Sequence, residues 1–264
     1  TPEMIAAMRA HLGLDQSLPQ QFIHWVVQIA HGDLGRSITS NQPVTTLVAS
    51  RLQPTPALAI ATIVFSILIA TPLGVLAAWR RGSWADALAS GGAVFGFAMP
   101  AFVTGYLLVY VFALKLQWLP VQGFVPLSEG FLPFARHLIL PTLTLSTIYI
   151  ALITRVTRAS MLEILGEDFI RTARAKGMPE RIVLFRHALG NSAIPVLSII
   201  GIGIALLLGG VVVTESVFSF PGLGRLTVEA VVARDYPVVQ GIIILFSGVY
   251  VLINLPVDIS YAIF

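Results

Sequence analysis

Side chains that could carry out catalysis or bind a metal are few and scattered in this sequence of 264 residues. The chain has no cysteine, so no thiolate can attack a substrate or hold a metal, and no disulfide can form. No two histidines have the spacing of helical metal ligands; they are His11, His24, His31, His137 and His187. The Gly-x-x-x-x-Gly-Lys loop that cradles ATP is missing from the sequence. We therefore expect no catalytic residue, no metal ligand, no enzymatic activity and no nucleic-acid partner.

The sequence between these scattered polar residues consists largely of long apolar stretches. The chain is 56% hydrophobic and 11% charged, whereas a soluble domain carries about 25% charged residues. Five stretches approach the length of about 20 residues that a helix needs to cross a bilayer. They are Pro56 to Trp79, Leu88 to Leu114, Leu138 to Thr154, Asn191 to Thr214, and Pro237 to Val257. The third is the shortest and should run on past Arg155. The pattern predicts an all-α, polytopic membrane helical bundle.

The composition of these five stretches bears on how transport could be driven. None of them contains Asp, Glu, Lys, Arg or His. A carrier driven by an ion gradient usually keeps an ionisable group at membrane depth, and an intramembrane hydrolase needs paired catalytic groups. Proton coupling and hydrolysis are therefore disfavoured, while sodium coupling through backbone carbonyls stays open. The hydroxyls and amides in the spans fit hydrogen bonding between helices or a permissive passage.

Basic residues in the short connections predict the orientation. One set of connections holds nine, which are Arg80, Arg81, Arg155, Arg158, Arg171, Arg174, Lys176, Arg181 and Arg186. The other set holds four, which are Lys115, Arg136, Arg225 and Arg234. The richer set should face the cytoplasm, which places residues 1–55 outside. Because the chain starts abruptly at Thr1 and shows an odd number of spans, we expect a further span before it.

Two regions follow from this topology. Residues 1–55 should form a small outer helical segment packed on the membrane domain, and residues 56–264 the transmembrane domain. In the outer segment, apolar residues at helical spacing fall in two groups. Met4, Ile5, Met8 and Leu12 form one, and Phe22, Ile23, Val26, Val27 and Ile29 form the other. Gly13 and Gly32 should end the two helices. We favour the interpretation that this segment is a structural cap over the alternative that it contacts the substrate directly.

The segment 161–190 is the longest connection predicted on the cytoplasmic side. Glu167 to Lys176 can form a helix that Gly177 breaks, and Pro179 suits the first turn of a second helix. The second helix carries a stripe of Ile182, Phe185 and Leu189. Two short amphipathic helices broken at a glycine would project from the membrane as a compact unit. An interfacial anchor lying flat on anionic lipid is the alternative.

The segment 215–236 on the outer side also carries structural signals. Phe218-Ser-Phe-Pro-Gly-Leu-Gly224 combines aromatic residues with a Pro-Gly turn. A short helix is expected from Leu226 to Val232. Pro221, Gly222 and Gly224 should permit a tight reversal, with Leu223 and Leu226 buried on the spans. An ordinary turn stabilised by local pairs is the alternative to a functional element.

These motifs together resemble one family. Arg171-Thr-Ala-Arg-Ala-Lys-Gly177 resembles the cytoplasmic coupling motif of binding-protein-dependent ABC permeases, and the wider chain resembles the first (B-type) membrane subunit of the dipeptide/oligopeptide branch. The stretches that carry this likeness are Gly32-Asp-Leu-Gly-Arg-Ser37, Thr71-Pro-Leu-Gly74, Trp118-Leu-Pro120, Leu140-Pro-Thr-Leu-Thr144, Arg155-Val-Thr-Arg-Ala-Ser-Met161, Phe220-Pro-Gly-Leu-Gly-Arg225 and Ala233-Arg-Asp-Tyr-Pro-Val-Val-Gln-Gly241. Arg51-Leu-Gln-Pro-Thr55 departs from the family, which usually has the proline directly after Arg-Leu.

The resemblance implies a type I ABC importer permease fold with six helices, in a bacterial inner membrane. It also implies a second homologous permease, two ATPases that bind ATP and magnesium, and an extracytoplasmic binding protein that delivers a peptide. This chain would have no cofactor of its own. Members of the family that carry nickel, glutathione or another small solute remain alternatives. An ion-coupled secondary carrier is the alternative from another class.

Two sets of residues then receive expected roles. The residues expected to couple to an ATPase are Glu167, Phe169, Ile170, Arg171, Thr172, Ala173, Arg174, Lys176, Gly177 and Arg181. Among them Phe169, Ile170 and Ala173 should make the apolar contacts, and Gly177 should set the bend. The residues expected to close the outer end of the pathway beneath the binding protein are Phe220, Pro221, Gly222, Gly224, Arg225, Arg234 and Asp235.

Overall fold

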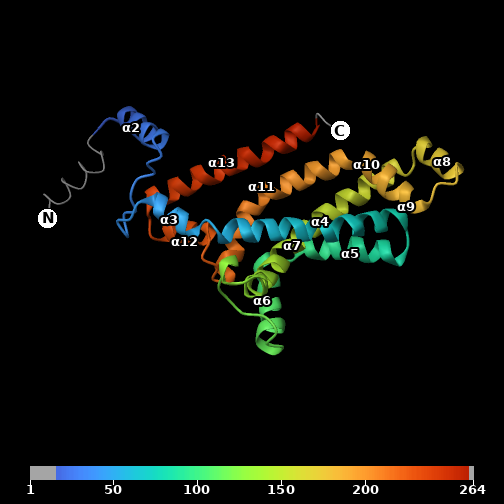
Figure 1. The fold of residues 1–264 in the computed structure, drawn as a ribbon, viewed down its shortest axis with the longest axis horizontal. Helices are drawn as coiled ribbons and strands as arrows, with labels where there is room; N and C mark the ends of the chain where they lie inside the picture. The colour runs from blue at the N-terminus through green and yellow to red at the C-terminus, as the bar shows by residue number, and fades with distance from the viewer. Residues whose placement is uncertain (1–15, 262–264) are drawn as a thin grey trace.

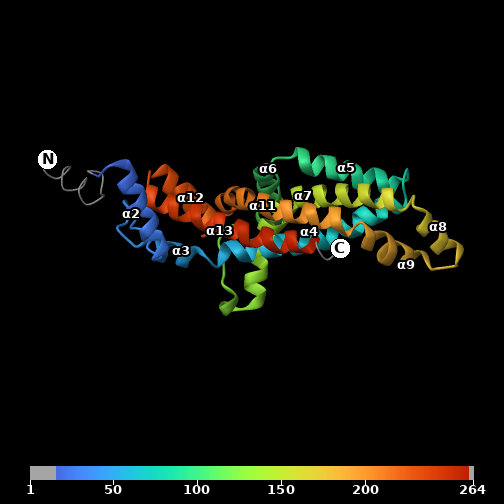
Figure 2. The same cartoon turned by 90° about the horizontal axis from the view of Figure 1, so that it is seen from above.

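The computed structural model describes residues 16–261, and this part of the chain is helical, without a β-sheet. The helices are α2 (Leu18–Ala30), α3 (Val44–Arg51), α4 (Pro54–Trp79), α5 (Trp84–Ala98), α6 (Ala101–Leu108), η1 (Val109–Lys115), η2 (Leu127–Glu129), α7 (Phe131–Ile164), α8 (Asp168–Ala175), α9 (Glu180–Ile182), η3 (Val183–Ala188), α10 (Leu189–Asn191), α11 (Ala193–Val217), α12 (Leu223–Val232) and α13 (Tyr236–Tyr261). The bundle is elongated, and α4, α7, α11 and α13 run along its length (Figures 1 and 2). The predicted all-α class is confirmed.

Three helical stretches are long and apolar enough to cross a bilayer, namely Val44–Trp79, Phe131–Ile164 and Tyr236–Pro256. Two bent pairs of helices bring the number to five if each pair counts as one span. On that count the five predicted spans are present. The third predicted span does run on past Arg155, since α7 ends only at Ile164.

The second predicted span, Leu88 to Leu114, is not straight. It is divided into α5 and the continuous pair α6–η1, which meet at an angle of 103°. The break falls at Met99 and Pro100, whose backbones are both extended. Proline disfavours helical geometry in the residue before it, and this explains why α5 ends here. As a result α6 leaves the bundle crosswise (Figure 1).

The central core forms where α4, α7 and α11 meet. Apolar length explains why these helices can span a membrane, whereas how far each is buried depends on its neighbours. Of the three unbroken spans, the one formed by α7 is the most enclosed. The buried side chains of this core are Leu58, Ala70, Leu138, Leu145, Tyr149, Ile153, Leu207, Val211 and Phe220. Phe220 comes from the 215–236 segment, so that segment is anchored in the core of the bundle.

A smaller apolar cluster lies at each end of the bundle. At one end, α8 and η3 pack on the ends of α4 and α7. At the other end, α3 and α12 pack with the start of α13. The 161–190 and 215–236 segments therefore lie at opposite ends of the long axis (Figure 1), as the predicted topology requires.

Candidate functional site

The 161–190 segment folds as two short helices around a glycine turn, as predicted. Helix α8 ends before Gly177, whose φ of +77° lies in the left-handed region that favours glycine. The second helix starts at Glu180, directly after Pro179. The Arg174 guanidinium donates to both carboxylate oxygens of Glu180, at 2.7 and 3.2 Å. This pair joins the two helices across the turn.

The apolar residues of α8 face in two directions. Ile170 is 0% exposed and Ala173 is buried beside Met161 of α7 and Val183 of η3. The expectation that both touch an ATPase is therefore not supported, because their side chains are used inside this chain. Phe169, in contrast, is 41% exposed. Of these three residues, only Phe169 has an apolar side chain that the rest of the described chain leaves partly uncovered.

The polar residues of this segment lie mostly on its surface. Glu167 precedes α8 and makes no side-chain cap. Arg171 pairs with Asp168 at 2.7 Å, and Thr172 donates to the carbonyl of Asp168 at 3.0 Å. Lys176 and Arg181 are exposed. The second helix exposes two further large apolar side chains, Ile182 and Phe185; the predicted stripe on that helix contained both, without assigning them a role.

The 215–236 segment reverses the chain between α11 and α12. Phe220 is buried and packs edge to face on Phe124, with ring centroids 5.1 Å apart. Leu223 and Leu226 are buried, as predicted. Ser219 carries the positive φ of the reversal, at +49°. The turn is therefore held by core packing as well as by its own sequence.

Glu215 is a residue of this segment that the sequence reasoning missed. The fourth span was expected to end at Thr214, but α11 continues to Val217 and includes this glutamate, which is 0% exposed. The premise that the spans hold no ionisable group is therefore wrong at this position. Its carboxylate accepts hydrogen bonds from the Thr55 hydroxyl at 2.6 Å and from the Arg225 amide at 3.0 Å. A glutamate close before an aromatic-Pro-Gly turn was the signal available in the sequence.

The charged residues expected at the outer gate have different surroundings. Arg225 donates to Glu229 at 2.8 Å, and Glu229 also lies 3.8 Å from Arg51 of α3. Arg234 is exposed and has a positive φ of 55°. Arg225 thus has a local partner in Glu229, while Arg234 lies on the surface.

Asp235 fastens residues of the 1–55 segment to the start of α13. It is 2% exposed, and its carboxylate accepts bonds from the hydroxyls of Ser37 and Thr39 and from the amides of Ile38 and Thr39. Burial raises the pKa of Asp235, but these hydrogen bonds outweigh burial and leave the pKa below its ordinary value. The carboxylate is therefore ionised at neutral pH and holds this contact.

The described part of the 1–55 segment, residues 16–55, is only partly packed on the membrane domain. Val44 and Val48 of α3 are buried against α12 and α13. Helix α2 forms where predicted and ends before Gly32, but it buries no residue, and Phe22 is 62% exposed. The expectation of a packed cap is thus wrong for α2. The first predicted helix, with Met4, Ile5, Met8 and Leu12, lies outside the described residues.

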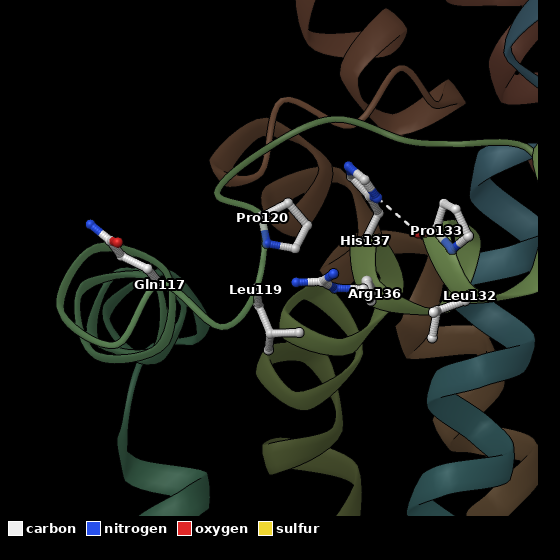
Figure 3. A pocket seen from close by; sticks show the side chains of 7 residues that line it. All are labelled: Gln117, Leu119, Pro120, Leu132, Pro133, Arg136 and His137. Atoms are coloured by element: carbon white, nitrogen blue, oxygen red, sulfur yellow. Dashed lines mark hydrogen bonds between the residues drawn. The ribbon is translucent and has the colours of Figure 1, made fainter.

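A pocket of about 390 Å³ opens between the end of η1 and the start of α7 (Figure 3). Its lining residues are Gln117, Leu119, Pro120, Leu132, Pro133, Arg136 and His137. Arg136 donates to the carbonyl of Trp118 at 2.7 Å, and the ring of His137 bonds the carbonyl of Pro133 at 2.8 Å. The pocket contains none of the residues predicted for a site. Among the described residues no group of acidic or histidine side chains could hold a metal ion.

Comparisons with known proteins agree with this arrangement. Residues 70–264 match the family model described as "Binding-protein-dependent transport system inner membrane component". The chain is 50% identical to the "Probable peptide ABC transporter permease protein y4tP" of Sinorhizobium fredii, over 99% of this chain and 83% of that protein. It is 44% identical to the "Glutathione transport system permease protein GsiC" of Escherichia coli K12, over 98% of this chain and 82% of that protein.

Solved structures share the fold. An inward-facing form of the MetNI methionine ABC transporter superposes with a TM-score of 0.68 at 17% identity, over 83% of this chain and 97% of that chain. An amino acid ABC transporter superposes with a TM-score of 0.60, also at 17% identity, over 83% of this chain and 95% of that chain.

Proposed function

Because this chain belongs to the binding-protein-dependent transport system inner membrane components, and is thus a multi-pass permease subunit of an ABC importer, we propose that it forms half of a pathway for di- and oligopeptides. A homologous permease would supply the other half. Two ATPases, which would hold ATP and magnesium, would act from the cytoplasm, and a binding protein would deliver the peptide from outside. This chain would contribute no catalytic group or cofactor.

The observation that carries the coupling role is the packing of the 161–190 segment. Ile170 and Val183 of this segment lie in one buried cluster with Val75 of α4 and Met161 of α7. A force applied to α8 would therefore move the ends of two spanning helices, because close-packed side chains transmit displacement. The Arg174–Glu180 pair, which is partly exposed, would help to keep the two short helices together.

The outward-facing side chains suit a protein partner. Phe169, Ile182 and Phe185 are exposed apolar residues on a segment that also carries Arg171, Lys176 and Arg181. Apolar side chains surrounded by polar ones are typical of interaction surfaces. We place Phe169 in the ATPase cleft and give Ile170 and Ala173 the inner role of holding α8 on the spans.

The opposite end of the bundle would close the pathway and receive the binding protein. Phe220 fixes the 215–236 segment in the core, while Arg234 remains exposed beside it. The uncovered apolar face of α2, with Phe22 and Val26, offers a second outer surface for the same partner. The residues from Pro221 to Arg225 would then respond to docking through α12.

Two relatives guide the choice of cargo. One is named a peptide permease and the other a glutathione permease, and glutathione is itself a small peptide. We therefore favour peptides over nickel or other solutes. Thr62, Ser66 and Ser146 are buried between the spans of this chain, so these hydroxyls do not line the passage.

Purification of the complex at native stoichiometry tests the proposal. Two ATPases, a second permease and an extracytoplasmic binding protein should copurify, and ligands released from the binding protein should include short peptides. In proteoliposomes, uptake should stop when ATP is removed and should persist when ion gradients are collapsed. Uptake that follows the ion gradient, or a binding protein that releases only metal ions, would contradict it.

A further inference from the structure

The carboxylate of Glu215 has a role that neither the family assignment nor the coupling segment explains. It lies in the last turn of α11, fully buried, where an ionised group is costly unless it is well paired. Its partners come from two other elements. Thr55 of α4 donates to one carboxylate oxygen at 2.6 Å, and the amide of Arg225 in α12 donates to the other at 3.0 Å.

Thr55 extends the same contact to the beginning of α12. While its hydroxyl donates to Glu215, its oxygen accepts the amide of Leu223 at 2.8 Å. The first amides of a helix have no partner within the helix, and the N-terminal end favours negative charge. The carboxylate and the hydroxyl therefore satisfy the start of α12 with groups from α11 and α4.

Gly222 and Gly224 are glycines because a side chain would clash with the Glu215 carboxylate or with α11. The backbone conformation of the reversal does not itself require glycine at these positions. Gly222 has φ −102° and ψ −176°, an extended conformation open to any residue. A Cβ atom on Gly222 would lie 2.0 Å from a carboxylate oxygen of Glu215. A Cβ atom on Gly224 would lie 2.6 Å from the Cα of Val212 in α11. Gly222 makes room for the carboxylate, and Gly224 lets α12 approach the α11 backbone.

The position of Glu215 in the chain gives this contact a mechanical consequence. Helix α11 is joined to the second helix of the 161–190 segment through a bend of 63° at its other end. Movement of that segment would thus reach α11 directly. At the outer end of α11, Glu215 is the residue through which the displacement would pass to α12 and to the end of α4.

We propose that Glu215 is a positioning residue that couples the outer motif to α11, so that Phe220–Arg225 moves together with this helix during transport. The proposal rests on the proposed function for its transport part. Its structural part, the contact between the carboxylate and the motif, stands apart from it and can be tested separately.

A suppressor experiment tests the contact. In the purified complex, Gly222→Ala should lower the yield and the thermal midpoint of assembled permease, since the new methyl group clashes with Glu215. Glu215→Ala removes the clash, so the double variant should be no less stable than Glu215→Ala alone. Gly224→Ala is the matched control. Glu215→Ala should not suppress the defect of Gly224→Ala, because the main clash of that methyl group is with the backbone of Val212. If the losses of stability in Gly222→Ala and Glu215→Ala simply add in the double variant, the proposed contact is wrong.

A second experiment tests the transport part in reconstituted complexes. Glu215→Gln keeps the shape of the side chain but replaces one of its two accepting oxygens with an NH2 group. Because an NH2 group cannot accept, the hydrogen bond from Thr55 or the one from the Arg225 amide is lost or reversed. Stimulation of ATPase activity by the binding protein loaded with trialanine should fall about tenfold, the factor expected when a buried hydrogen-bonding group loses its partner. Glu129→Gln, on an exposed glutamate of η2, is the control and should keep full stimulation.

The two experiments separate the outcomes. Suppression at Gly222 together with full stimulation in Glu215→Gln would overturn the transport role and leave a purely structural contact. A wild-type complex that shows no stimulation by the loaded binding protein would contradict the proposed function. In that case the suppressor pair would still decide whether Glu215 holds the motif.

Discussion

Replacing Ile170 with alanine should loosen the 161–190 segment from the ends of α4 and α7. The side chain is fully buried with Met161 and Val183, in the cluster at one end of the bundle. Loss of the carbon atoms beyond Cβ costs about 0.8 kcal/mol for each one, and the cavity left behind brings the total to about 2–5 kcal/mol. Such a loss should be local to this segment.

Hydrogen exchange in the purified complex is the assay for this change. Amides of α8 and η3 should exchange faster in Ile170→Ala, whereas those of α11 should keep their protection. Phe169→Ala is the matched variant on the neighbouring position. Because Phe169 is 41% exposed, its loss should cost about 1 kcal/mol or less, yet it should reduce ATP-driven transport if this side chain enters the ATPase.

The comparison of the two variants can refute the reasoning. Unchanged exchange in Ile170→Ala would show that the cluster does not hold α8 on the spans. Stable assembly with normal transport in Phe169→Ala would remove Phe169 from the ATPase contact. A variant of Ile170 that loses ATPase binding without any change in exchange would restore the direct contact first expected for it.

Three further predictions concern the two ends of the bundle. Gly177→Val should insert normally but couple ATP hydrolysis poorly to transport, because a φ of +77° costs a residue with a side chain about 1–2 kcal/mol; full transport would exclude the coupling role. Cysteines placed singly at Glu180 and Glu229 should react with an impermeant reagent from opposite sides of the membrane, and labelling of both from outside intact cells would overturn the topology. The contact of Asp235 with Ser37 and Thr39 should persist at neutral pH, because hydrogen bonding lowers the pKa of Asp235. It should weaken only when the pH falls to this lowered pKa, which is below the ordinary aspartate value of about 3.9. Asp235→Asn should make the segment around Ser37 and Thr39 more accessible to protease at neutral pH. Equal cleavage in wild type and variant would show that Asp235 does not hold this segment.

The sequence by itself determined the features that depend on local chemistry. Apolar length predicted the number of spans, because a helix must cover the thickness of a bilayer wherever it lies. The break at Gly177 followed from the freedom of glycine at positive φ, and the end of α2 followed from Gly32. The burial of Leu223 and Leu226 could be expected from their spacing after the Pro-Gly turn.

Only the tertiary structure decided which surface covers which. Helical periodicity showed that α8 has an apolar face, but it could not tell that Ile170 packs inward while Phe169 stays exposed. An apolar run from Leu88 to Leu114 could not reveal how far the chain turns at Pro100. Glu215 and Asp235 each accept a hydrogen bond from a residue more than a hundred positions away in the chain, Thr55 for Glu215 and Ser37 for Asp235. Contacts at such separation depend on how the helices pack, and no local pattern in one sequence records that packing.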